Sequence, residues 1–281
     1  MTAVAVVGAG GMLGHDLMVA IPGARGFVHA ELDIRDAEAV ESALGDFDVI
    51  INAVAYNRVD DAESDTETAM AVNASGPEHL ARTAARSGAK LIHVSTDYVF
   101  DGSATKPYRE DAPRHPMSAY GRSKAEGEVR ALAANPGGTA IVRTAWLYGE
   151  HGGSFPRTML RLARERDTVS VVTDQIGQPT WTVDLARQIA ALIEKGAPAG
   201  IYHGTASGET SWYGFAREVY QLAGLDPERV QPTDSTAFVR PAPRPAYSVL
   251  GHGAWDAIGI APQRDWRAQI AEAMALGILD R

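Results

Sequence analysis

The sequence contains no cysteine, which excludes disulfides and thiolate chemistry and is compatible with a cytoplasmic location. It lacks an apolar run of the roughly 18 to 20 residues that a membrane-spanning helix needs, so we expect no membrane partner. Its first residues lack a basic segment and enter a strand and glycine loop at once, so we expect no signal peptide. The net charge of −9 argues against a nucleic-acid partner.

Metal-binding motifs are also missing. There is no HExxH motif and no cluster of histidine and cysteine at ligand spacing, so we predict no catalytic metal. The eight histidines are scattered along the chain, and we interpret each as a surface or core residue.

What is present is the pattern of an α/β protein. The 281 residues are 45% hydrophobic, enough for one large domain and a smaller lobe. Apolar strands alternate with helical stretches up to about residue 149 and less regularly beyond it, which predicts a Rossmann-type doubly wound parallel sheet with a smaller, mixed α/β substrate-binding lobe. We expect residues 1–149 and about 182–204 to form the dinucleotide-binding domain. The substrate-binding lobe would comprise about 150–181 and 205–281.

The first strand, residues 3–7, ends in a glycine-rich turn. Gly8, Gly11 and Gly14 give the spacing GxxGxxG before a helical stretch. Backbone N–H groups and the helix dipole at such a turn can bind a pyrophosphate, so we predict a dinucleotide site. The segment 25–31, where the second strand would contact the adenine ribose, carries both acidic and basic residues. The choice between NADPH and NADH therefore stays open.

Tyr120 and Lys124 lie four residues apart in an Ala/Glu-rich run that predicts a helix, so they project from one face. A lysine ammonium beside a tyrosine favours the phenolate and lowers the tyrosine pKa towards the range of efficient proton transfer. The pair alone is common on half-exposed helices. A second observation supports it: Ser95, Thr96 and Asp97 follow the strand 90–94, where hydroxyls could bind a substrate oxygen.

With these motifs in hand, the sequence resembles the dTDP-4-dehydrorhamnose reductases, within the extended short-chain dehydrogenase/reductases. The resemblance covers nearly the whole chain. It rests on GAGGMLG at 8–14, LDIRD at 32–36, NAVAYNRVDDAESD at 52–65, VNASGP at 72–77, VSTDYVFDG at 94–102, YGRSK at 120–124, RTAWLYG at 143–149, DQIGQPTW at 174–181 and RPAYSVL at 244–250.

The resemblance implies a function and its residues. The chain would reduce the 4-keto group of dTDP-4-dehydro-6-deoxy-L-mannose to give dTDP-L-rhamnose, with NADPH or NADH as cofactor. Tyr120 would donate the proton, Lys124 would hold the nicotinamide ribose and lower the tyrosine pKa, and Thr96 would orient the ketone. Asp97 and Trp146 would contact the sugar. The positions that match the family's dinucleotide lining are Gly11, Met12, Leu13, Asp33, Ile34, Ala55, Tyr56 and Asn57.

Alternatives remain at this point. The chain could reduce another nucleotide-activated deoxysugar, or it could be a non-catalytic dinucleotide-binding regulatory subunit, although the presence of Thr96, Tyr120 and Lys124 together argues against the latter. A dehydratase is disfavoured because Thr96 is followed by Asp97-Tyr98 and not by two carboxylates. Some family members form dimers linked by magnesium. Asp16 lies near one matching carboxylate, but Val183 stands where another is expected, so we assign no metal-binding residue and leave open both a magnesium ion and the choice between monomer and homodimer.

Overall fold

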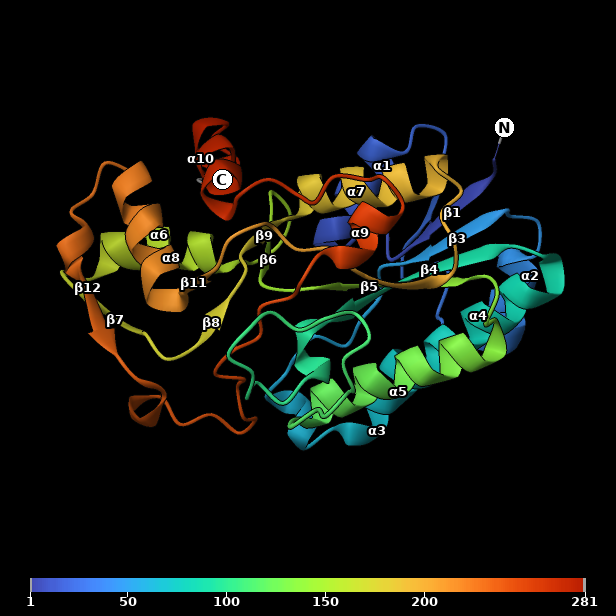
Figure 1. The fold of residues 1–281 in the computed structure, drawn as a ribbon, viewed down its shortest axis with the longest axis horizontal. Coiled ribbons are helices and arrows are strands. Elements are labelled where there is room, and N and C mark those ends of the chain that lie inside the picture. The colour runs from blue at the N-terminus through green and yellow to red at the C-terminus, as the bar shows by residue number, and fades with distance from the viewer. Residues whose placement is uncertain (1, 280–281) are drawn as a thin grey trace.

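Six parallel strands form the central sheet of the computed structural model, which describes residues 2–279. Met1, Asp280 and Arg281, at the ends of the two expected units, lie outside this range. The order across the sheet is β10 (Gly200–His203), β5 (Thr139–Thr144), β4 (Lys90–Thr96), β3 (Val49–Asn52), β1 (Val4–Val7) and β2 (Arg25–Phe27). The order reverses between β1 and β3, which creates the switch point where such sheets bind ligands. The predicted Rossmann-type sheet is confirmed (Figure 1).

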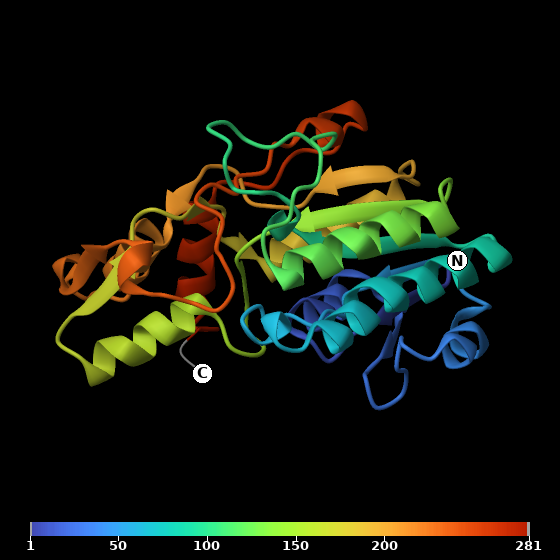
Figure 2. The same ribbon diagram turned by 90° about the horizontal axis from the view of Figure 1, so that it is seen from below.

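The strands are apolar throughout because helices cover both faces of the sheet. All four residues of β1 are buried, and Val6 lies opposite Ile51 of β3. One face carries α1 (Met12–Ala20), α7 (Thr182–Glu194) and the short α9 (Gly253–Ala257), and the other carries α2 (Ala37–Leu44), α4 (Gly76–Ser87) and α5 (Ala119–Ala134) (Figures 1 and 2). Continuous apolar strands are what a sheet buried on both faces requires.

One helix differs from the prediction. The sequence predicts a single helix from about residue 69 to 87, whereas the structure has α3 (Thr66–Met70), a π-helical turn (Ala71–Ser75) and then α4. Inside this turn the Asn73 side chain is fully buried and bonds to the backbone of Tyr56 on both sides: its Oδ1 accepts from the N–H at 2.8 Å and its Nδ2 donates to the C=O at 3.0 Å. π-Helical turns occur most often at functional sites.

The smaller lobe has its own core. Its elements are α6 (Phe155–Glu165), β7 (Val169–Val172), β8 (Ile176–Gly177), β9 (Thr180–Trp181), β11 (Thr210–Ser211), α8 (Trp212–Leu222), β12 (Val230–Thr233) and α10 (Trp266–Ala275), and β6 (Leu147–Tyr148), at the end of the first expected unit, joins them. The strands pair in twos, β7 with β12, β8 with β11 and β6 with β9. Aromatic side chains dominate the buried interior, among them Trp181, Phe215, Tyr220 and Trp266.

The chain crosses between the two lobes more than once. After β9 it returns to the sheet through α7 and β10, where Ile201 pairs with Ile141, and it then runs back to β11 (Figure 1). Leu185 and Ile189 of α7 belong to the same hydrophobic cluster as Val4 and Val6. These contacts support our proposal that 1–149 and 182–204 form one lobe and 150–181 and 205–281 the other.

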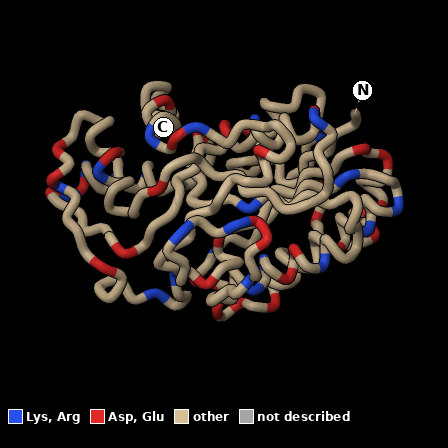
Figure 3. The backbone as a smooth tube through the Cα atoms, in the orientation of Figure 1, with Lys and Arg blue, Asp and Glu red and all other residues tan. Residues whose placement is uncertain are grey.

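A strap, residues 234–246, leads from β12 back to the larger lobe. It is held at Asp60, whose Oδ1 accepts from the Ala242 N–H at 3.2 Å and whose Oδ2 lies 3.0 Å from Nη2 of Arg244. Basic and acidic residues are interspersed in both lobes (Figure 3). Within residues 2–279 none of the helices is both long and apolar enough to cross a membrane.

Candidate active site

The glycine loop lies at the carboxyl end of β1 and opens a cavity of about 900 Å³. The first turn of α1 follows Gly11, and no side chain caps it. Its N–H groups, which have no partner within the helix, are therefore suited to the oxygens of a pyrophosphate. A Cβ at Gly14 would lie 2.1 Å from the Gly8 carbonyl oxygen, so only glycine allows this packing. The residues present thus fit a dinucleotide.

Most of the residues expected to bind the dinucleotide share this cavity. Those that line it are Gly8, Gly11, Met12, Leu13, Asp33, Ile34, Ala55, Tyr56, Asn57, Tyr120 and Lys124. Gly14 does not line the cavity and lies behind the loop. The Asp33 carboxylate accepts from Nε of Arg35 at 2.9 Å and from Nη2 of Arg35 at 2.5 Å, and this pairing holds its pKa at about 2. The carboxylate is therefore ionised at neutral pH.

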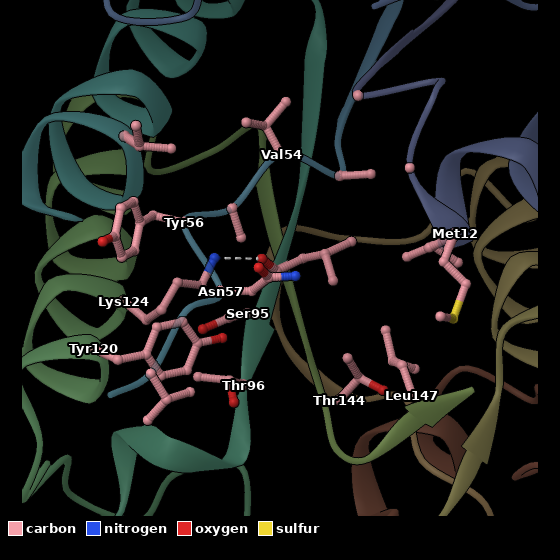
Figure 4. A pocket seen from close by; sticks show the side chains of 18 of the residues that line it. Met12, Val54, Tyr56, Asn57, Ser95, Thr96, Tyr120, Lys124, Thr144 and Leu147 are labelled. Carbon is pink, nitrogen blue, oxygen red and sulfur yellow. Dashed lines mark hydrogen bonds between the residues drawn. The ribbon is translucent and has the colours of Figure 1, made fainter. Parts of the chain in front are cut away.

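Tyr120 and Thr96 come together although 24 positions separate them in the chain. Ser118 caps α5 by accepting from the Gly121 N–H at 3.1 Å, and this starts the helix that carries Tyr120. Thr96 ends β4, and its hydroxyl donates to Asp97 Oδ1 at 2.9 Å. Figure 4 shows the Tyr120 ring beside Thr96 at the wall of the cavity.

The pKa of Tyr120 moves opposite to the expected direction. Burial raises it to about 12, the negative charge of Asp97 adds to the rise, and a hydrogen bond with Thr96 only partly opposes it. The predicted lowering by Lys124 is wrong for this structure, because desolvation of the phenolate is the larger effect. At neutral pH Tyr120 keeps its proton, which suits an acid. Asp97 is also buried, and burial raises its pKa to about 6.

Lys124 is 1% exposed, and its Nζ donates to the Val94 carbonyl at 2.8 Å (Figure 4). Burial lowers its pKa to about 8, although the carboxylate of Glu128 acts in the other direction. His93 lies behind it, with Nε2 3.5 Å from Nζ, and Asn52 contacts the other ring nitrogen. His93 is thus a buried residue, as expected of a core histidine, but its contact with Lys124 was not foreseen.

Behind the cavity lies a buried ionic cluster. The Glu128 carboxylate accepts from Nε and Nη2 of Arg143 at 2.9 and 2.8 Å, from Nε of Arg114 at 2.6 Å and from the Ser95 hydroxyl at 2.6 Å. Burial alone would raise the pKa of Glu128, but these partners hold it below its usual range. The cluster ties α5, which carries Tyr120 and Lys124, to β4 and β5.

Trp146 faces the cavity from the opposite side. Its φ of +48° is unusual for a residue other than glycine, and its indole stacks on Trp212 with ring centres 3.6 Å apart. A Cβ at Gly177 would lie 2.6 Å from the Trp146 ring, so the indole needs glycine beneath it. Trp212 also lines the cavity. Two stacked indoles, Trp146 from the end of the first unit and Trp212 from the smaller lobe, thus form a flat apolar wall next to Thr144 and Leu147.

The sequence did not point to Asn52, Asn73 or Trp212 as site residues. Asn52 and Asn73 occur inside motifs shared with the family, and these motifs could have marked them as site residues. Their hydrogen-bond partners, however, are set by strand register for Asn52 and by the π-helical turn for Asn73. Asp16, near the expected magnesium position, has a raised pKa from burial. Within residues 2–279 no three His, Cys, Asp or Glu side chains are arranged to hold a metal ion.

One cavity at the switch point of a doubly wound sheet therefore joins the glycine loop, Tyr120, Lys124 and Thr96. This fold and site define a dinucleotide-dependent oxidoreductase of the extended short-chain dehydrogenase/reductase class. The model of the family described as RmlD substrate binding domain matches residues 1–277. The chain belongs to this family, that of the dTDP-4-dehydrorhamnose reductases.

Individual relatives agree. A dTDP-4-dehydrorhamnose reductase of Streptomyces griseus is 49% identical over 278 residues, which cover 95% of this chain and 91% of the relative. A dTDP-4-keto-6-deoxy-D-glucose reductase of Streptomyces niveus is 45% identical and covers 96% of both chains. The crystal structure of dTDP-4-dehydrorhamnose reductase from Bacillus anthracis in complex with NADP has a TM-score of 0.94 at 34% identity, and covers 98% of this chain and 100% of that one. The predicted family is confirmed.

Proposed function

We propose that this chain reduces the 4-keto group of dTDP-4-dehydrorhamnose to give dTDP-L-rhamnose, with NADPH or NADH as the reductant. The observation that carries the proposal is the meeting of Tyr120, Thr96 and Lys124 in the cavity that also contains the glycine loop. The relatives named for this reaction cover nearly the whole chain at 44–49% identity, which supports the same substrate class.

In this proposal the bound reduced nicotinamide supplies the hydride. Tyr120 donates its proton to the oxygen that was the ketone, and its high pKa ensures that the proton is present at neutral pH. Thr96 orients that oxygen beside Tyr120, and Lys124 holds the nicotinamide ribose. Asp97 positions the Thr96 hydroxyl through the 2.9 Å hydrogen bond and, with Trp146, contacts the sugar.

A second sugar is favoured by one observation. The 45%-identical relative from Streptomyces niveus is named for a D-sugar, dTDP-4-keto-6-deoxy-D-glucose. The two substrates differ in the configuration of the hexose, which the side chains around Trp146 and Trp212 would have to distinguish. The D-sugar is therefore the alternative substrate of the same site.

The test follows oxidation of NADPH or NADH while the keto-sugar is made in place from dTDP-glucose by a dehydratase, with or without the epimerase. Oxidation that requires the epimerase supports the L-sugar, and oxidation without it supports the D-sugar. Tyr120→Phe should lower kcat by about 10²- to 10⁴-fold and leave dinucleotide affinity nearly unchanged. Tight dinucleotide binding without turnover of either sugar would support the regulatory subunit instead.

A further inference from the structure

We propose that His93 is a positioning residue for Lys124: in a tautomer set by Asn52, it presents an N–H to the Lys124 amine and favours the neutral amine before the dinucleotide binds. The inference deepens the proposed function, on which the role of Lys124 depends. It rests on three side chains from neighbouring strands and α5 that are all buried, with Asn52 and His93 fully enclosed.

The tautomer of His93 follows from a chain of hydrogen bonds. Asn52 Oδ1 accepts from the backbone N–H of Val54 at 3.0 Å, which fixes the orientation of the amide. Its Nδ2, a group that can only donate, lies 3.0 Å from His93 Nδ1. His93 Nδ1 must therefore accept, and the single proton of the neutral ring must be on Nε2. Strand register supports the arrangement, because Asn52 and His93 are direct partners across β3 and β4.

The proton on Nε2 restricts what Lys124 can be. His93 Nε2 lies 3.5 Å from Nζ, and Nζ also donates to the Val94 carbonyl. An ammonium would direct a third N–H towards the Nε2–H, so that two donors would face each other. A neutral amine instead donates to Val94 and into the cavity, and its lone pair accepts from His93. The neutral amine satisfies both contacts, so this arrangement lowers the pKa of Lys124 towards neutral pH.

The other ionisable groups around Lys124 do not reverse this preference. Glu128, one turn further along α5, favours the ammonium, but its carboxylate is shared between Arg143 and Arg114. Tyr120, one helical turn before Lys124, keeps its proton at neutral pH. Asp97, in the short turn that follows β4, raises the pKa of Tyr120. His93 stays neutral in either state of Lys124, since burial keeps its pKa well below the usual range and a charged Lys124 lowers that pKa further.

Binding of a dinucleotide shifts the equilibrium between the neutral and the charged form of Lys124. Its phosphates bring negative charge into the cavity, and a ribose hydroxyl offers an acceptor to Lys124, so the ammonium becomes the favoured form. The fraction of Lys124 that is neutral then takes up a proton from solvent as the dinucleotide binds. His93 thus makes binding depend on pH: affinity for NADPH should decline as the pH rises above the pKa of Lys124 in the free enzyme.

Nitrogen-15 NMR of the ligand-free protein tests the tautomer directly. The expected pattern for His93 is a protonated Nε2 and an unprotonated Nδ1 that do not change between pH 5.5 and 8.5. The His93 signals are those absent from His93→Gln. A protonated Nδ1, or a ring that titrates in this range, would overturn the proposal.

Calorimetry of NADPH binding in buffers of different ionisation enthalpy measures the proton uptake. Near pH 8 the wild type should take up about half a proton per NADPH. In His93→Gln the amide oxygen can accept from the ammonium, so uptake should fall at least twofold. The decline of affinity with pH should begin roughly one pH unit higher. The matched control is His115→Gln, which alters an exposed histidine and should behave as wild type. Equal uptake in all three proteins would overturn the proposal.

A second variant, Asn52→Asp, keeps the test decisive if His93→Gln fails to fold. In Asn52→Asp the carboxylate accepts from Nδ1, so the proton should move from Nε2 to Nδ1 in the NMR spectrum, and uptake should again fall. An unchanged tautomer would contradict the mechanism. A failure of wild-type protein to bind either NADPH or NADH would overturn the proposed function, whereas the NMR result decides the His93 arrangement without any ligand.

Discussion

At the scale of single residues, the pairing of Tyr120 with Lys124 was predictable and the surroundings of the pair were not. Tyr120 and Lys124 are four residues apart, so their common helix face follows from the helical period alone. The contact between Asn52 and His93 joins positions 41 apart and depends on the register of two parallel strands. The pKa of Tyr120 depends on burial, which the residue types did not reveal.

Asp97→Asn should raise the free energy of unfolding, although it removes the carboxylate that accepts from the Thr96 hydroxyl. Burial raises the Asp97 pKa from 3.8 to about 6, so the folded state holds the proton more tightly than the unfolded state does. The ionised carboxylate therefore lowers the free energy of unfolding above pH 6, by about 3 kcal/mol at most. This loss vanishes once the pH falls below the ordinary pKa of an aspartate. Denaturant unfolding should show a gain for Asp97→Asn at pH 8 that disappears at pH 3.5. An equal gain at both values would contradict the shift.

At the scale of elements, the strands and most helices could be predicted, because continuous apolar runs and capping residues have a local physical cause. The break between α3 and α4 could not. It depends on the Asn73 side chain, which bonds to the Tyr56 loop and donates to the Ser123 hydroxyl at 3.0 Å across to α5. The helical pattern of residues 69–87 cannot predict a hydrogen bond to Ser123, which lies 50 residues further along the chain.

The position of α5 against the sheet should depend on Glu128. Glu128→Gln leaves Arg143, which is 1% exposed, without its buried carboxylate, and such losses cost about 3–5 kcal/mol. Chemical denaturation should detect this loss. Glu126→Gln on the same helix is the control, because its ion pair with Arg130 is partly exposed and should contribute less than about 1 kcal/mol. Similar losses in both variants would argue against the importance of the buried cluster.

At the scale of the whole molecule, the sheet was predictable from the alternation of strands and helices, and the smaller lobe was predictable only in outline. Its paired strands are two to four residues long, too short for a periodic signal. Its relation to the sheet depends on long-range contacts such as the strap at Asp60, which is 182 positions from its partner Ala242.

Asp60→Asn should loosen the strap. The change removes the charge that pairs with Arg244, a partly buried contact worth about 1 kcal/mol, so opening of the strap should increase about fivefold. Thermolysin cleavage near Val239, which is 89% exposed, would measure it. Asp61→Asn alters a neighbouring carboxylate that pairs with the exposed Arg58 and should leave the cleavage rate unchanged. Faster cleavage in both variants, or in neither, would exclude Asp60 as the anchor.

The repeated crossing of the chain between the sheet and the smaller lobe limits how recombination can exchange parts of this fold. The residues of the smaller lobe come from two separate stretches of the chain, with α7 and β10 of the sheet encoded between them. A single recombination event cannot exchange this lobe as a unit. If the smaller lobe binds the sugar as we propose, substitutions around Trp146 and Trp212 are a more direct route to a new sugar preference than exchange of the whole lobe.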